Sequence, residues 1–416
     1  MNDKETAPTP ELVITGDTNW WSRVMRALMY SHEKSTGDSA STSFLSCVLF
    51  DAHDGEMTMY SESATSTVAI TLTGDDTVEV KGSGEFLVPV PDLNRQISSM
   101  PTGDIVVSFY DDKTVKIHDE AETIEFIIGT VDIINEDMVP RAPVEHEKKV
   151  ATVSVHGGDL VEAYRSASTM ALPVEKDPLA GQDPMAGCYV TIGDNGIQMF
   201  SLSVSASESL IPVKGPKKSS TIATSPSTTL PRLGVFMDSE VDVAIVGDTI
   251  HIGDGTIHMV LTSLNTGNRR SKPSVENIMR VMTPAWESGV VDVSLSSHEF
   301  FTALGRADST GSSSVEIQVT DTSVTMSVPK GNGNTPFRQK ISCSTEWLDD
   351  SEHWLSMFFN ISSVKSLAYT VGKRDTIRFR VSLKKDGSPW AMIIIPDDYD
   401  ADDPHNYQMI QLTSRA

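Results

Sequence analysis

The sequence lacks three features that would indicate a secreted, zinc-binding or membrane protein. Its three cysteines, Cys47, Cys188 and Cys343, are far apart and form no CxxC pair, which argues against a disulfide framework and a zinc site. No run approaches the roughly 18 consecutive apolar residues of a membrane span. The polar, acidic beginning of the chain is unlike a secretory signal. We therefore expect a cytoplasmic protein with reduced, buried thiols and no membrane partner.

The sequence also lacks the local motifs of common enzymes. No P-loop, GxSxG or GxGxxG pattern joins a strand to a helix, and the ten histidines include no HExxH pair. His251 and His258 lie seven positions apart on expected strands, so we interpret them as ordinary strand residues. The acidic run at 397–403 lacks the glycine and final glutamate of an EF-hand and is interpreted as a solvated loop. We expect no catalytic residue, cofactor or metal.

Positive charge is scarce. The chain has 33 basic and 57 acidic residues and a formal net charge of -24. This balance argues against a nucleic-acid partner unless the basic residues gather on one surface. With 416 residues, 39% of them apolar, the chain is long enough for two to four globular domains.

An internal repeat organises this length, and each copy begins with an amphipathic helix. Apolar residues occur at i, i+3, i+4 and i+7, the spacing of one helix face. They are Trp21, Val24, Met25 and Leu28 after Asp17, then Leu160, Ala163, Tyr164 and Ala167 after Asp159, and Phe300, Ala303, Leu304 and Ala307 after the capping box Ser296–Glu299. Leu160 follows Trp21 by 139 positions, and Phe300 follows Leu160 by 140. This spacing predicts three similar domains.

The remainder of each copy predicts strands, a shorter helix and a closing hairpin. Alternating apolar and polar residues around a turn predict antiparallel strands at 44–61, 186–201 and 313–328. Shorter helices are expected from Val90, from Ser225 and from Asn360, which would cap its helix. Closing hairpins are expected at 105–117, 241–252 and 376–395.

Pattern-poor segments rich in proline and charge, 142–149 and 265–277, are interpreted as linkers. They predict domains at 1–146, 147–287 (with a linker at about 265–287) and 288–416. The expected class is α+β, with two helices and antiparallel sheets in each domain.

This order of elements resembles the bacterial DNA polymerase III beta sliding clamp over essentially the whole chain. The best local matches are GEFLVPVPDLNRQISSMPTGDIVVSF from Gly84, AGCYVTIGDNGIQM from Ala186, MRVMTPAWES from Met279 and FFNISSVKSLAYTV from Phe358. Two family signatures differ: LSVSAS at 202–207 replaces a TDxHRL-like run, and MIQLTSRA from Met409 replaces an apolar-Pro-Met-Arg-Leu ending. Such divergence is typical of a bacteriophage-encoded clamp or a clamp-like paralogue.

The resemblance implies three clamp-type domains that form a half-ring, and a homodimer that encircles duplex DNA without reading its sequence. Such a ring tethers the replicative polymerase and is opened by a clamp loader, at the nucleoid or replication fork, or in the host cytoplasm if phage-encoded. A sliding ring needs basic side chains on the helices that line the hole. The candidates are Arg23, Arg26, Arg95, Arg165, Arg232, Arg306 and Lys365. Simple solvation of scattered arginines remains the alternative.

The resemblance also implies a groove for partner peptides and a dimer interface. The groove positions would be Met185, Leu202, Val204, Arg280, Val281, Met409, Ile410 and Leu412. An ordinary closing strand and core residues are the alternative for these positions. At the interface, Phe126 and Ile128 of one protomer would contact the 306–314 region of the other protomer, including Ser309 and Thr310. That region is polar, so a weak interface or a monomer stays open.

Two other classes remain. A repeat-built structural or assembly protein of a virus particle would share the strands rich in serine and threonine but need no basic helices. An enzyme of unrecognised type is the third. Placement of Arg23, Arg26, Arg165 and Lys365 on one concave face would favour the clamp.

Overall fold

The computed structural model describes most of the chain. The described residues are 8–30, 46–53, 55–63, 65–73, 78–133, 152–172, 183–202, 206–264, 275–330, 335–349, 353–366, 375–395 and 408–411. They form two compact units, each described by itself. Unit 1 comprises residues 1–158 and 231–263, and unit 2 comprises residues 159–230 and 264–416.

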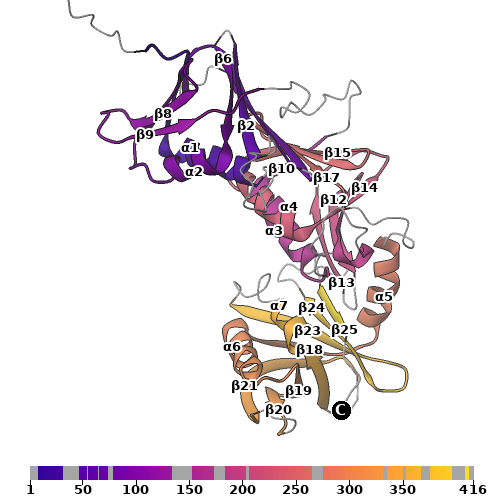
Figure 1. Ribbon diagram of the computed structural model, residues 1–416. Coiled ribbons are helices and arrows are strands. Elements are labelled where there is room, and N and C mark those ends of the chain that lie inside the picture. Colours follow the sequence, from indigo (N-terminus) through magenta and orange to yellow (C-terminus); the bar gives the residue numbers. More distant parts are fainter. Residues whose placement is uncertain are drawn as a thin grey trace, which may run out of the picture. The chain divides into compact units, whose positions relative to one another are not determined.

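A similar order of elements occurs three times along the chain: a strand, a helix, four or five strands, a second helix and three strands (Figure 1). The first copy contains β1 (Leu12–Asp17), α1 (Thr18–Met29), β2 (Cys47–His53), β3 (Glu56–Ser63), β4 (Ser66–Thr73), β5 (Val78–Gly82), β6 (Gly84–Pro89), α2 (Val90–Ile97), β7 (Asp104–Phe109), β8 (Thr114–Asp119) and β9 (Glu125–Gly129). The second contains β10 (Val153–His156), α3 (Gly157–Ser168), η3 (Pro184–Ala186), β11 (Cys188–Gly193), β12 (Gly196–Leu202), β13 (Ala206–Pro212), β14 (Ser220–Thr224), α4 (Pro226–Leu233), η4 (Gly234–Phe236), β15 (Glu240–Val246), β16 (Thr249–Gly253) and β17 (Ile257–Thr262).

Helix α5 (Val275–Glu287) then precedes the third copy. This copy contains β18 (Gly289–Ser296), α6 (Ser297–Asp308), β19 (Ser314–Thr320), β20 (Ser323–Val328), β21 (Phe337–Trp347), β22 (Trp354–Asn360), α7 (Ile361–Ser366), β23 (Thr376–Leu383), β24 (Pro389–Ile395) and β25 (Gln408–Gln411). The predicted alternation of helices with antiparallel strands is confirmed.

Unit 1 contains two antiparallel sheets. The smaller has the order β5-β1-β7-β8-β9, and the larger has the order β10-β15-β16-β17-β4-β3-β2-β6. Helices α1 and α2 pack together, and the predicted stripe of α1 is buried, with Trp21 fully so. The Trp21 indole donates to the carbonyl oxygen of Ile105 at 3.3 Å, so the polar atom of this large side chain is satisfied in the core.

Unit 2 contains one long sheet, with the order β14-β11-β12-β13-β25-β24-β23-β18-β21-β20-β19-β22. Its largest apolar cluster joins the α6 stripe to the third-copy strands through Phe300, Phe359 and Phe379, each fully buried. Helix α6 packs against α7, as α1 packs against α2 in unit 1. The two pairs give the repeat a common local arrangement.

Side-chain caps fix the starts of three helices where the sequence indicates them. The Asp17 carboxylate accepts from the N–H of Trp20 at 2.7 Å, and the Ser296 hydroxyl accepts from Glu299 at 3.3 Å. The Asn360 side chain accepts from the N–H of Ser363 at 3.1 Å. These bonds satisfy N–H groups that an α-helix leaves without partners.

Three details differ from expectation. Helix α5 occupies 275–287, within the segment interpreted as a linker. Helix α3 begins at Gly157 rather than after Asp159. Cys47 and Cys188 are buried free thiols as predicted, but Cys343 is only half-buried.

Within the described ranges, no helix is long and apolar enough to cross a membrane.

Candidate functional site

Six of the seven basic residues proposed to face DNA share one position, the last turn of their helix. They are Arg26 in α1, Arg95 in α2, Arg165 in α3, Arg232 in α4, Arg306 in α6 and Lys365 in α7. A cation there stabilises the partial negative charge at the helix C-terminus. This accounts locally for the recurrence and also places a positive group at the same end of each helix.

Arg26 and Arg165 are the least engaged members of this set. Arg26 is exposed and Arg165 is half-buried. Among the described residues, neither guanidinium forms an ion pair, whereas Arg95 lies 3.5 Å from Asp92. An unpaired guanidinium can bind phosphate without first losing another partner.

Three other members have weak local partners. Arg95 pairs with Asp92 on the same helix, and both side chains are largely exposed. The Lys365 ammonium lies 2.6 Å from the Asp308 carboxylate, and Arg306 donates to the Gln339 side chain at 2.9 Å. Exposed pairs of this kind contribute at most about 1 kcal/mol, so a phosphate group can compete for these cations.

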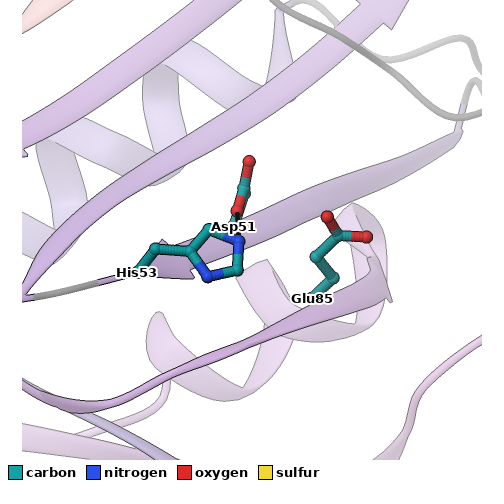
Figure 2. Close-up of side chains that lie close together, drawn as sticks. All are labelled: Asp51, His53 and Glu85. Carbon is teal, nitrogen blue, oxygen red and sulfur yellow. Dashed lines mark ion pairs between the residues drawn. The ribbon is translucent and has the colours of Figure 1, made fainter.

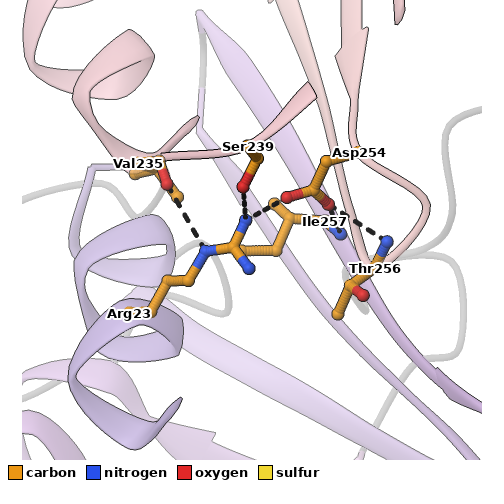
Figure 3. A network of polar contacts seen from close by, with 6 residues as sticks. All are labelled: Arg23, Val235, Ser239, Asp254, Thr256 and Ile257. Atoms are coloured by element: carbon orange, nitrogen blue, oxygen red, sulfur yellow. Dashed lines mark hydrogen bonds and ion pairs between the residues drawn. The ribbon is translucent and has the colours of Figure 1, made fainter. Parts of the chain in front are cut away.

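Arg23 instead connects the two segments of unit 1, residues 1–158 and residues 231–263 (Figure 3). Its guanidinium forms an ion pair with Asp254, donates to the Ser239 hydroxyl at 3.1 Å and reaches the Val235 carbonyl oxygen at 3.4 Å. Asp254 also accepts from the backbone N–H of Thr256 at 3.1 Å and of Ile257 at 2.8 Å. The guanidinium is therefore bound from several sides.

The Asp254 carboxylate is well suited to hold this cation. Its side chain is only 5% exposed. Burial raises its pKa, but the backbone N–H of Ile257 and the charge of Arg23 outweigh burial and hold the pKa below its ordinary value. The carboxylate thus remains ionised beside Arg23 at neutral pH.

Arg232 is buried in unit 1, with 7% of its surface exposed. Its Nε donates to the Ser66 hydroxyl of β4 at 3.1 Å, and burial lowers its pKa to about 10. Arg23 and Arg232 thus connect the second copy of the repeat to the first, and we no longer assign either to a DNA-facing surface. The sequence offered no signal for this role, because both partners are remote.

Two of the eight predicted groove residues, Leu202 and Met409, lie in one row of paired positions across four strands of unit 2. Leu202 of β12 pairs with Ala206 of β13, which pairs with Met409 of β25, which in turn pairs with Ile393 of β24. Residues opposite one another in antiparallel strands share a face. Ala206 and Ile393 are buried in a cluster with Met282, against which Leu202 packs, half-buried.

The other groove positions have a mixed outcome. Met185 is 39% exposed, and Arg280 is exposed on α5. For Val281 of α5 and for Ile410 of β25, only the backbone is described. Val204 and Leu412 lie outside the described residues. The groove therefore stays a prediction, supported by the backbone register and by the exposure of Met185.

Two edge strands bear on the predicted dimer interface. Strand β9 ends the smaller sheet of unit 1, with Phe126 and Ile128 half-buried and Ile127 58% exposed. Strand β22 ends the sheet of unit 2, and its Trp354 is 53% exposed. Ser309 is the exposed C-cap of α6 and Thr310 is half-buried. Exposed apolar edges favour pairing with another strand. The sequence analysis named neither Ile127 nor Trp354.

Comparison with known proteins identifies the fold. No protein-family profile and no curated protein matches the sequence. The DNA polymerase III beta subunit of Thermotoga maritima is 14% identical and has a TM-score of 0.74, with 97% of this chain and 100% of that chain covered.

Two further structures match over 97% of this chain and 100% of their own. They are the DNA polymerase III beta chain of Streptococcus pneumoniae (12% identical, TM-score 0.74) and a Pseudomonas aeruginosa sliding clamp bound to griselimycin (12% identical, TM-score 0.75). The chain therefore has the sliding-clamp fold, and the predicted resemblance and fold class are confirmed at the level of structure.

Proposed function

We propose that two copies of this chain close into a ring around duplex DNA and tether a replicative DNA polymerase to it. The observation that carries this proposal is the sliding-clamp fold over 97% of the chain. An accessible basic residue in the last turn of five helices, α1, α2, α3, α6 and α7, supports it. A virus-particle assembly protein would need neither feature, so the same observations disfavour that alternative.

DNA contact is assigned to the cations that are weakly paired or that form no ion pair among the described residues. They are Arg26, Arg95, Arg165, Arg306 and Lys365. Arginine and lysine bind phosphate without reading the bases, which suits a ring that must slide. The formal net charge of -24 repels DNA from the remaining surface, so the basic helices offer the favourable path.

A loader-independent experiment tests encirclement. A duplex is fixed to a bead at one end, and the purified protein is added with the other end either free or already blocked by a bulky protein. We expect binding only when the free end allows threading, and retention in high salt when that end is blocked afterwards. Equal binding to a duplex with a free end and to a duplex blocked before the protein is added would contradict the ring.

The proposed ring is a homodimer. Phe126 and Ile128 of β9 in one protomer would face the Ser309–Thr310 region and β22 of the other protomer. Light scattering should give a mass near twice 45.2 kDa. Ile127→Asp places a charge on the exposed edge of β9 and should shift the mass toward the monomer. Ile124→Asp is the matched control, because Ile124 is also exposed but precedes the strand. A monomer at all concentrations of the wild type would exclude this closure.

The proposed partner site is the row of strand positions Leu202, Ala206, Met409 and Ile393 in unit 2. The proposed partners are the polymerase and a clamp loader. Both would insert a short peptide with apolar anchors, a mode in which buried side chains supply the affinity. A synthetic peptide from the polymerase III alpha subunit is the probe. We expect Leu202→Ala to weaken its binding by about tenfold or more, whereas the exposed Met237→Ala should not change it. Unaltered binding to Leu202→Ala would move the partner site elsewhere.

A further inference from the structure

A cluster of three potential metal ligands lies on the larger sheet of unit 1, apart from the basic helix ends. It consists of Asp51 and His53 of β2 and Glu85 of β6, and one ligand atom from each lies within 4.8 Å of the others. Figure 2 shows the three side chains projecting from the two strands. Motif searches miss this set because its members come from two separate parts of the sequence.

The strand register brings the three side chains together. Asp51 pairs directly with Glu85, and His53 follows Asp51 by two residues, so all three share one face of the sheet. Phe50 and Ala52 point to the opposite face and are fully buried. A shift of one residue would expose this core, so packing fixes the register and holds the three ligands on rigid strands.

The local charge around the three side chains is negative and would favour a cation. Asp51 and Glu85 are like charges placed directly opposite one another, an unfavourable arrangement for two carboxylates alone. Glu56 of β3 lies opposite His53 and adds a further acidic group. The Oδ1 atom of Asp51 lies 2.8 Å from Nε2 of His53, and the two side chains are 30% and 64% exposed, so solvent reaches the cluster.

We propose that Asp51, His53 and Glu85 bind a divalent transition-metal ion of the zinc class. One imidazole with two carboxylates suits such an ion better than magnesium or calcium, which prefer oxygen ligands throughout. Three protein ligands leave coordination positions for water on the exposed side of the strands. The ion would join β2 to β6 and neutralise the carboxylate pair. The site is independent of the proposed ring and of its partners.

Calorimetry with Zn²⁺ on the full chain tests this assignment. We expect one saturable site whose affinity falls by about tenfold or more in His53→Gln and in Glu85→Gln. Two matched controls should retain it: His298→Gln changes an exposed histidine of unit 2, and Glu79→Gln changes an exposed glutamate of β5. Binding that is unsaturable, or equally tight in His53→Gln and the controls, would overturn the proposal.

Two spectroscopic measurements distinguish this site from the cysteines and from adventitious binding. Co²⁺ at the site should show ligand-field bands without a thiolate charge-transfer band, because all three ligands are nitrogen or oxygen. Zn²⁺ should also slow amide hydrogen exchange in β2 and β6, and this protection should disappear in His53→Gln. A thiolate band, or protection confined to other strands, would refute the assignment.

Discussion

The first copy of the repeat joins the second differently from the way the second joins the third. In unit 1, the first seam is the pairing of β17 with β4 over five residue pairs, from Ile257 with Ile70 to Leu261 with Ser66. In unit 2, the second seam is the pairing of β13 with β25 over two pairs. The first seam also has the polar contacts of Arg23 and Arg232, whereas the second rests on an apolar cluster around Met282.

The difference shows how one repeated fold can serve two purposes. A long strand pairing with an ion pair whose Asp254 side chain is only 5% exposed favours one fixed geometry, because removing Arg23 would leave that carboxylate without its charge partner. A short pairing beside half-buried apolar side chains such as Leu202 leaves surface that can receive a peptide. The second seam is therefore the place where the proposed partner groove is compatible with the fold.

The largest effect is expected from truncating the core of the second seam. Met282→Ala removes a fully buried side chain from the cluster and should lower the free energy of unfolding by about 3 kcal/mol. Hydrogen exchange should accelerate in β13 and β25 but not in β4 and β17. The exposed Met237→Ala is the control and should change stability by less than about 0.5 kcal/mol. Acceleration in both seams would mean that they are not independent.

A somewhat smaller effect is expected from the ion pair of the first seam. Asp254→Ala leaves Arg23 without its charge partner and two backbone N–H groups without an acceptor, which should cost about 2 kcal/mol. Exchange should accelerate in β4 and β17, the reverse of the Met282→Ala pattern. Asp254→Asn keeps an acceptor for the N–H groups and should lose less. If amide exchange in β4 and β17 is as slow in Asp254→Ala as in the wild type, the ion pair does not stabilise the first seam.

Acid should weaken the first seam selectively. The pKa of Asp254 is lower in the folded chain than its ordinary value of 3.8, so its stabilisation is present above that value. The stabilisation is lost as the pH falls through 3.8 toward the lower folded pKa. The stability difference between wild type and Asp254→Asn should therefore shrink between about pH 6 and about pH 3. A constant difference in urea unfolding would show that Asp254 does not titrate as described.

The smallest effect on stability is expected from the basic helix ends that belong to neither seam. Arg26→Glu with Arg165→Glu should lower the free energy of unfolding by only about 1 kcal/mol, because each reversal removes a favourable charge from a helix C-terminus but breaks no ion pair among the described residues. The same double variant should weaken retention on end-blocked DNA and reduce its dependence on salt. Retention equal to wild type would remove these two arginines from the DNA-facing set.

Much of the fold could be predicted because its signals are local. The stripe from Trp21 to Leu28 and its two later copies mark helices by spacing alone. The caps at Ser296 and Asn360 act across three residues. Helix α5 also carried such a signal, since Ile278, Val281, Met282 and Ala285 follow the same spacing. The preceding segment 265–277, rich in charge and poor in pattern, favoured a linker instead.

The candidate sites could be predicted only in part. The last-turn cations were visible as a recurring residue type, but the sequence could not separate Arg26, which is exposed, from Arg23, which is bound to Asp254. The metal ligands Asp51 and Glu85 gave no motif, because only the β2–β6 register brings them together.

The sequence by itself thus determined the repeat, the helices and hairpins that recur in it, and the residue types at the helix ends. The tertiary structure alone decided which charges pair and which apolar residues share a row. Arg23 and Asp254 are separated by 231 positions, and Ala206 pairs with Leu202 on one side and with Met409 on the other. Helix spacing and capping act within a turn or two of backbone, whereas these partners depend on strand register, which a shift of one residue would change completely.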